Sequence, residues 1–269
     1  MRIVFMSNME IEHHHIISSI DDEFSIDKII HPVYSSAGSE KSFLNTWGTS
    51  RIFSIKNFFN RIYYRSKLKR DQYNSFKKIF ITPVAEQCKI IDIRRSKINS
   101  QYGIELISSL SPDLIIVSGA PILSKKLFSL PGVKVINVHF GIAPFYRGND
   151  TVFWPLYYRD YNKIGVTIHY INDGIDRGPI IARAYPEIEP GDSEFSLYLK
   201  CSRMAAHLLS EIIRAMGKGK VIKGIPQDKK GSLYSWRGRT SVKNIEYWFR
   251  RVIKKERPPY LAEIKELFF

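Results

Sequence analysis

Two side chains able to take part in catalysis lie close together near the middle of the sequence, the amide of Asn137 and the imidazole of His139. They end the run Val133–His139, whose apolar, β-branched composition is typical of a buried strand. Because side chains alternate across a strand, both point to the same face. An amide can donate hydrogen bonds to a developing oxyanion, and an imidazole can carry a proton near neutral pH. A polar pair at a strand end can equally cap backbone groups, so the pair alone does not establish catalysis.

The residues after this strand form a loop rich in structure breakers, which are Gly141, Pro144 and Gly148. The loop also holds Tyr146 and Arg147. A second strand pattern follows over residues 165–171, with Thr167 and His169 on one face. The next loop is acidic and glycine-rich; in it Asp173-Gly174 is a turn pair, and Asp176 follows closely.

These two stretches, NVHFGIAPFYRG at 137–148 and IGVTIHYINDGIDRG at 164–178, resemble the folate-dependent formyltransferase family. The shared features are an Asn-x-His strand end, a Pro-containing loop with Tyr-Arg-Gly, a Gly-Val-Thr-x-His strand and an Asp-x-x-Asp loop. The family includes glycinamide ribonucleotide formyltransferase, methionyl-tRNA formyltransferase and the sugar-nucleotide N-formyltransferases. The resemblance is good over residues 113–195 and holds only in outline elsewhere.

The resemblance implies a role for each matching residue. Catalysis is expected from Asn137 as oxyanion donor, His139 as a second donor or proton carrier, and Asp176 as the partner of the imidazole. The implied cosubstrate is 10-formyltetrahydrofolate, which is expected to contact Gly119, Ala120, Pro121, Ile122, Leu123 and Asp173. Substrate contacts are expected from Tyr146, Arg147 and His169.

Two of these assignments have plain structural alternatives. Residues 119–123 match the folate loop of the family only loosely and can be a simple strand-to-helix turn. Arg147 can anchor the folate loop, bind a phosphate or tie down its own loop.

The elements that position these residues follow from the alternation of strand and helix patterns, which predicts an α/β fold with a doubly wound, Rossmann-like, mostly parallel sheet. Ligands bind such sheets at the carboxyl ends of the strands. The strands at 113–118 and 133–139 end there with Gly119 and His139. A helix is expected over Ser96–Leu110, with Ser96 as its N-cap and Tyr102 in its apolar stripe.

Two domains are expected, a formyltransferase catalytic domain at 1–217 and a small C-terminal extension at 218–269. The first ends with a helix capped by Asp192 or Ser193. The extension has helical patterns near Val242–Lys254 and Leu261–Phe269.

The composition is typical of a soluble globular protein, with 44% hydrophobic and 25% charged residues in 269. We expect no membrane insertion, because no apolar run approaches the ~20 residues that cross a bilayer. The absence of a signal-peptide pattern and the presence of only two cysteines favour the cytoplasm. No metal site is expected: the histidines at 13–15 would point ~100° apart on a helix and cannot bind one ion without other ligands.

The formal charge of +15 predicts attraction to anions, whether nucleic acid, acidic lipid or a phosphorylated small molecule. The segment Arg51–Lys78 adds basic side chains interleaved with aromatic ones. Such a segment can pair with phosphate and stack a base, or form an amphipathic helix with a solvated basic face.

The function that these features favour is transfer of a formyl group to the amine of a nucleotide-linked amino-deoxysugar, as in lipopolysaccharide O-antigen biosynthesis. The long insertion at 35–80 motivates this choice of a sugar nucleotide as the partner, with nucleic acid disfavoured and a homodimer left open. A methionyl-tRNA formyltransferase-like enzyme is an alternative, although those enzymes carry a larger C-terminal β domain. A glycinamide nucleotide acceptor leaves the insertion unexplained. A non-catalytic nucleic-acid-binding module explains the charge but not the spacing of Asn137, His139 and Asp176.

Overall fold

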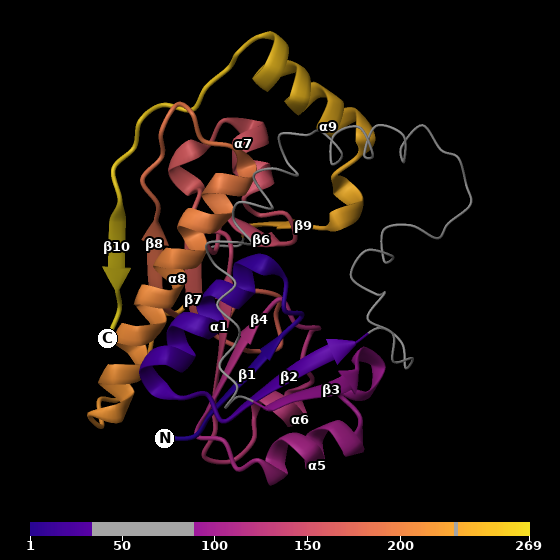
Figure 1. Cartoon of the computed structure of the whole chain (residues 1–269), viewed down its shortest axis with the longest axis vertical. Helices are drawn as coiled ribbons and strands as arrows, with labels where there is room; N and C mark the ends of the chain where they lie inside the picture. Colours follow the sequence, from indigo (N-terminus) through magenta and orange to yellow (C-terminus); the bar gives the residue numbers. More distant parts are fainter. Residues whose placement is uncertain (34–88, 229–230) are drawn as a thin grey trace.

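The structure is a computed structural model that describes residues 1–33, 89–228 and 231–269. The predictions for the insertion at 35–80, including the basic and aromatic segment Arg51–Lys78, lie outside the described residues. An eight-stranded sheet forms the centre of the described part (Figure 1). In the order in which they lie in the sheet, its strands are β10 (Ile264–Leu267), β8 (Ile180–Tyr185), β7 (Val166–Tyr170), β5 (Lys134–His139), β4 (Leu114–Ser118), β1 (Ile3–Ser7), β2 (Lys28–Val33) and β3 (Lys89–Arg94).

The strand order reverses at β1. Strands β5, β4, β1, β2 and β3 pair in parallel, whereas β7, β8 and β10 are each antiparallel to a neighbour. Since β2 and β4 lie on opposite sides of β1, the carboxyl ends of β1 and β4 mark the switch point at which doubly wound sheets bind ligands. The predicted α/β, doubly wound, mostly parallel fold is confirmed.

Side chains alternate along the strands and pack into two cores, one on each face of the sheet. Ile3 and Phe5 of β1 pack in the core that also contains residues of α1 (Ile11–Phe24) and α8 (Glu194–Gly217), which lie side by side in Figure 1. The other core is completed by α5 (Gln101–Ser109) and α6 (Lys125–Phe128). Ile136 and Val138 of β5 join the first core and Val135 the second. The predicted alternation in β5 is therefore confirmed.

Short elements complete the described part. They are η1 (Arg95–Lys97), β6 (Tyr146–Gly148), α7 (Phe153–Tyr158), η2 (Tyr161–Lys163), β9 (Ser232–Tyr234), η3 (Trp236–Gly238), α9 (Ser241–Trp248) and the π-helical turn η4 (Phe249–Ile253). β9 pairs in parallel with β6, which joins residues 232–234 to the loop that follows β5. In the described ranges no helix is both long enough and apolar enough to cross a bilayer.

Two helix predictions need correction. Ser96 lies in η1, and α5 is capped by Ser100, whose hydroxyl accepts a hydrogen bond from the Gly103 N–H. The predicted start of the helix was misplaced because a 3₁₀ turn precedes α5. Tyr102, which was predicted to lie in the apolar stripe, is 61% exposed. The helical pattern at 261–269 is also wrong, because Ile264–Leu267 forms β10 on the edge of β8. In so short a run, apolar spacing does not separate helix from strand. The helical prediction at 242–254 is confirmed, and of the two predicted cap residues Ser193 is the N-cap of α8.

Candidate active site

The antiparallel pairing of β5 with β7 places the central side chains of the site. Asn137 lies opposite His169, and His139 lies opposite Thr167. Because opposed residues point to the same face, the Asn137 Nδ2 atom lies 3.1 Å from His169 Nε2. His169, predicted to contact substrate, therefore makes a direct hydrogen bond to Asn137.

The loop after β7 brings Asp176 against both histidines. Its Oδ1 atom accepts a hydrogen bond from Asn137 Nδ2 at 3.3 Å and lies 3.5 Å from His169 Nε2. Its Oδ2 atom lies 3.5 Å from His139 Nδ1 and accepts a hydrogen bond from the Gly148 N–H at 2.8 Å. Asp176 has φ of 49°, in the left-handed region that Asp and Asn adopt more readily than most residues. Asn137, His139 and Asp176 thus meet in one cluster. Sequence patterns could not show that the Gly148 N–H belongs to it.

The Asp176 carboxylate is ionised in this cluster. Burial alone raises the pKa of Asp176, but the His139 and His169 rings and the Gly148 N–H outweigh it and hold the pKa below its ordinary value of 3.8. His139 Nδ1 faces this carboxylate, and its Nε2 lies 2.7 Å from the Tyr146 carbonyl oxygen. Both partners of His139 are acceptors, so each ring nitrogen faces an oxygen that can accept a hydrogen bond from it.

We expect the stability that Asp176 contributes to depend on pH. Because the pKa is lower in the folded chain, the contribution is complete above pH 3.8 and is lost as the pH falls through the folded-state value. Urea unfolding of the wild type and of Asp176→Asn at descending pH measures the effect. The difference in their free energies of unfolding should change once the pH falls below about 4 and be steady above about 6. A difference that does not vary across the acid range would mean that the carboxylate is not held by the histidines.

Buried hydrogen bonds fix the loop that follows β5. The Thr167 hydroxyl accepts from the Ala143 N–H at 3.1 Å and donates to the Gly141 carbonyl at 2.7 Å. A Cβ atom at Gly141 would lie 2.6 Å from His139 Nε2, so glycine leaves the room that the ring needs. The loop is therefore built around the His139 side chain.

Replacing Thr167 by Val should loosen this loop, because the change keeps the shape of the side chain and leaves two buried backbone groups without a partner. We expect the free energy of unfolding to fall by about 1–3 kcal/mol. Chemical denaturation of the variant measures the loss. The control is Ser210→Ala, which removes a buried hydroxyl from α8. Thr240→Val is unsuitable as a control, because the exposed Thr240 hydroxyl caps α9. A Thr167→Val loss no larger than that of the control would show that the two bonds do not hold the loop.

Tyr146 and Arg147, both predicted to contact substrate, are buried. The Tyr146 hydroxyl donates to Asp160 at 3.1 Å. The Arg147 guanidinium donates to the carbonyl of Ile175 at 3.3 Å and to that of Gly231 at 2.7 Å. This arrangement fits the alternative in which Arg147 ties down its own loop, and it links that loop to the residue before Asp176.

The residues predicted to hold folate lie at the carboxyl end of β4 and in the loop after β7. Gly119 has φ of +70°, and Ile122 is 71% exposed whereas Leu123 is buried. The Asn99 side chain donates to the Ile122 carbonyl at 2.9 Å and accepts from the Ser124 N–H at 2.7 Å, which fixes the segment. Ala120 and Pro121 are half-buried, and Asp173 is exposed.

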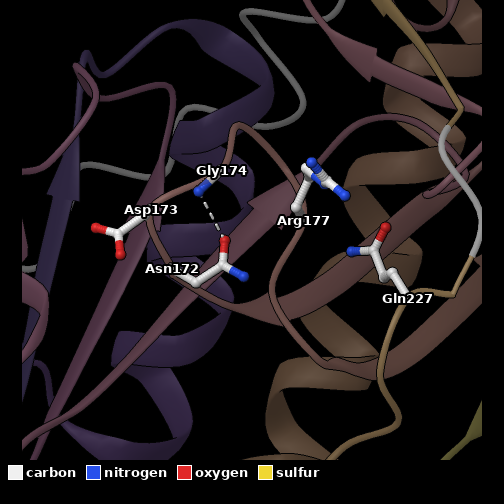
Figure 2. A pocket seen from close by; sticks show the side chains of 5 residues that line it. All are labelled: Asn172, Asp173, Gly174, Arg177 and Gln227. Atoms are coloured by element: carbon white, nitrogen blue, oxygen red, sulfur yellow. Dashed lines mark hydrogen bonds between the residues drawn. The ribbon is translucent and has the colours of Figure 1, made fainter.

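A hollow of about 240 Å³ opens beside the Asp176 loop (Figure 2). It is lined by Asn172, Asp173, Gly174, Arg177 and Gln227. Gln227 Nε2 donates to the carbonyl oxygens of Asp176 at 3.0 Å and of Gly178 at 2.8 Å, so it supports the loop that carries the carboxylate. Sequence patterns could not show this contact, since Gln227 lies in an irregular segment far along the chain.

Comparison with known proteins identifies the family. The formyl transferase family profile matches residues 67–213, more than half of the chain. The chain belongs to the formyl transferase family. The predicted resemblance to folate-dependent formyltransferases is thus confirmed, and the match extends beyond residues 113–195 at both ends.

Relatives of this formyl transferase family member carry different names. A methionyl-tRNA formyltransferase from Bacillus cytotoxicus is 30% identical over 170 residues, or 62% of this chain and 54% of that protein. The chain spans about half the length of the curated relatives it matches. A sugar N-formyltransferase structure from a Shewanella species has a TM-score of 0.54 at 15% identity, covering 88% of this chain and 78% of that one. A phosphoribosylglycinamide formyltransferase structure from Anaplasma phagocytophilum has a TM-score of 0.55 at 13% identity, covering 88% of this chain and 98% of that one. These structures establish the fold but do not select an acceptor.

Proposed function

We propose that this member of the formyl transferase family transfers a formyl group from 10-formyltetrahydrofolate to the amine of a nucleotide-linked amino-deoxysugar. The observation that carries the proposal is the cluster of Asn137, His139 and Asp176 at the carboxyl end of β5. The segment at 119–123, where folate is expected, follows the neighbouring strand β4. A cytoplasmic location is part of the proposal, because a buried free thiol at Cys201 suits a reducing compartment.

The reaction makes three demands on the site. The lone pair of a neutral amine attacks the formyl carbon, and the carbonyl oxygen becomes an oxyanion. The intermediate then breaks its bond to folate N10, and a proton passes from the amine nitrogen to N10. The site must therefore stabilise negative charge on oxygen, orient the amine and move one proton.

His139 and Asp176 meet the first and third demands. A protonated His139 ring beside the Asp176 carboxylate can donate to the oxyanion, which is worth about 3–4 kcal/mol for one well-placed donor. In the structure the Nε2 atom donates to the Tyr146 carbonyl, so we expect this bond to open when the formyl oxygen binds. The ionised carboxylate holds the ring and can relay the proton through a water molecule.

Asn137 meets the second demand through its carbonyl oxygen. Its Nδ2 atom is engaged by Asp176 and by His169, so donation to an oxyanion requires one of these bonds to exchange. Its Oδ1 atom makes no hydrogen bond in the described ranges and can accept an N–H of the incoming amine. The bonds from Nδ2 to Asp176 and His169 therefore orient the Asn137 side chain so that its Oδ1 atom can bind the acceptor amine.

An aromatic stack supports a nucleotide-linked acceptor. It is formed by Tyr146, Tyr234, Trp154 and Tyr158, with successive ring centroids 5.3, 4.9 and 6.0 Å apart. It begins at the residue whose carbonyl binds His139 and ends at the 50%-exposed ring of Tyr158. The Lys243 ammonium lies 4.9 Å from the Trp154 ring. The exposed Tyr158 ring can stack a base, and the Lys243 ammonium at the buried Trp154 ring can pair with a diphosphate.

A tRNA acceptor is the second candidate. It is favoured by the names of the curated relatives, which are methionyl-tRNA formyltransferases. The charge of +15 suits the phosphates of RNA as well as those of a sugar nucleotide.

An acceptor panel separates the two candidates. The pure chain is incubated with formyl-labelled 10-formyltetrahydrofolate and, in separate reactions, with nucleotide-linked aminosugars, charged initiator tRNA and glycinamide ribonucleotide. We expect labelled formamide from at least one aminosugar and none from tRNA. Product from tRNA, with an affinity that falls steeply with salt, would support the second candidate. No product from any acceptor would count against formyl transfer itself.

A further inference from the structure

A second cluster of ligating side chains lies apart from Asn137, His139 and Asp176, at the start of α1. Glu10, Glu12 and His13 each offer one ligand atom, and these atoms all lie within 4.8 Å of one another. Consecutive histidines cannot bind one ion without other ligands. The fold places two carboxyl groups beside the first histidine of the run.

The His13 side chain has the arrangement of a metal-binding imidazole. It is 5% exposed, its Nδ1 atom lies 2.8 Å from Ser118 Oγ, and its ring packs edge-on against Phe140 at 5.5 Å. The Ser118 hydroxyl oxygen can accept a hydrogen bond from Nδ1–H, and in that tautomer Nε2 keeps a lone pair. Within the described part of the chain Nε2 has no hydrogen-bond partner. A ligating imidazole is typically held in this way, with one nitrogen bound to a neighbouring acceptor and the other free.

The two carboxylates lack a counter-charge. In the ranges that the structure covers, neither Glu10 nor Glu12 pairs with a lysine or arginine. Glu10 occupies the N-cap position of α1, but its side chain makes no capping hydrogen bond. The Glu10 and Glu12 side chains lie within hydrogen-bond distance of each other, which brings their oxygen atoms together as the ligands of one ion would be.

We propose that Glu10, Glu12 and His13 bind a divalent transition-metal ion of the Zn²⁺ type, with Ser118 holding the His13 ring. Two carboxylates and an imidazole are a common ligand set for such ions, and three protein ligands leave a position open. Gly119 lies against the His13 ring, since an added Cβ there would be 2.4 Å from Nε2. The ion would thus lie at the switch point between β1 and β4, open to water or to a substrate oxygen. The proposal does not depend on formyl transfer.

Equilibrium dialysis of the full chain tests the site. The chain is stripped with a chelator and then given Zn²⁺ alone, and we expect a single tight site per chain. Glu10→Gln and Glu12→Gln each remove one ligand atom and should weaken binding by at least about tenfold. Ser118→Ala keeps all three ligands but frees the His13 ring, and it should weaken binding by about 10–100-fold.

Two matched controls show whether the effect is specific. Asp22→Asn removes an exposed carboxylate from the same helix, and His14→Gln removes the neighbouring histidine. Both should keep the wild-type affinity, and circular dichroism checks that every variant is folded. The proposal is wrong if the stripped chain binds no Zn²⁺, or if Glu10→Gln and Glu12→Gln bind it as the wild type does. It is also wrong if the controls lose as much affinity as the ligand variants, since the ion is then held by surface charge or by the histidine run.

Discussion

Asp176→Asn is expected to lower kcat for formyl transfer by about 10²–10⁴-fold while the chain stays folded. The substitution removes the charge that faces His139 Nδ1 and His169 Nε2, so neither the protonated ring nor the proton path is supported. The fold tolerates the change because Asn adopts positive φ readily and its carbonyl can still accept the Gly148 N–H.

Steady-state kinetics with the preferred acceptor measure this effect, and urea unfolding confirms that the variant is folded. Asp228→Asn is the matched control, since it removes an exposed carboxylate in the same region without touching the cluster. A kcat for Asp176→Asn within a few-fold of the control would show that the carboxylate has no part in the chemistry.

Asn137→Ala is expected to lower kcat by about 10²–10³-fold, with a smaller effect on the KM for folate. The change removes the amide that Asp176 and His169 hold, and with it the group that orients the amine. Asn162→Ala, at an exposed position in η2, is the control.

The double variant with Asp176→Asn tells whether the two side chains act together. If they do, the double variant should be little slower than the slower single variant, because residues that act as a unit are far from additive. Fully multiplicative losses would instead point to independent roles.

The sheet was largely predictable from local sequence. In β5, Ile136 and Val138 alternate with Val135 and Asn137, and burial on both faces follows directly from that pattern. The edge strand β10 was not predictable, because Ile264–Leu267 becomes a strand only through its pairing with β8. The Ser100 cap was missed for a local reason, since the 3₁₀ turn before it carries no distinct apolar signal.

The candidate site, like the fold, was predictable from the sequence only in part. The proximity of Asn137 and His139 could be predicted from the sequence because both belong to one strand. The contact between Asn137 and His169 depends on the register of β5 with β7, which only the folded sheet sets. The Glu10, Glu12 and His13 cluster includes a contact from His13 to Ser118 on a distant strand, which the histidine run alone could not reveal.

A crystal structure of the chain with bound tetrahydrofolate tests the central claim most directly. We predict that the pterin lies against residues 119–123 and that N10 lies within about 4 Å of the Asn137 or His139 side chain, close to an attack geometry. Folate bound at another place would contradict the proposed role of this cluster. A structure in which the protein's own loop fills the crevice at β5 would contradict it as well.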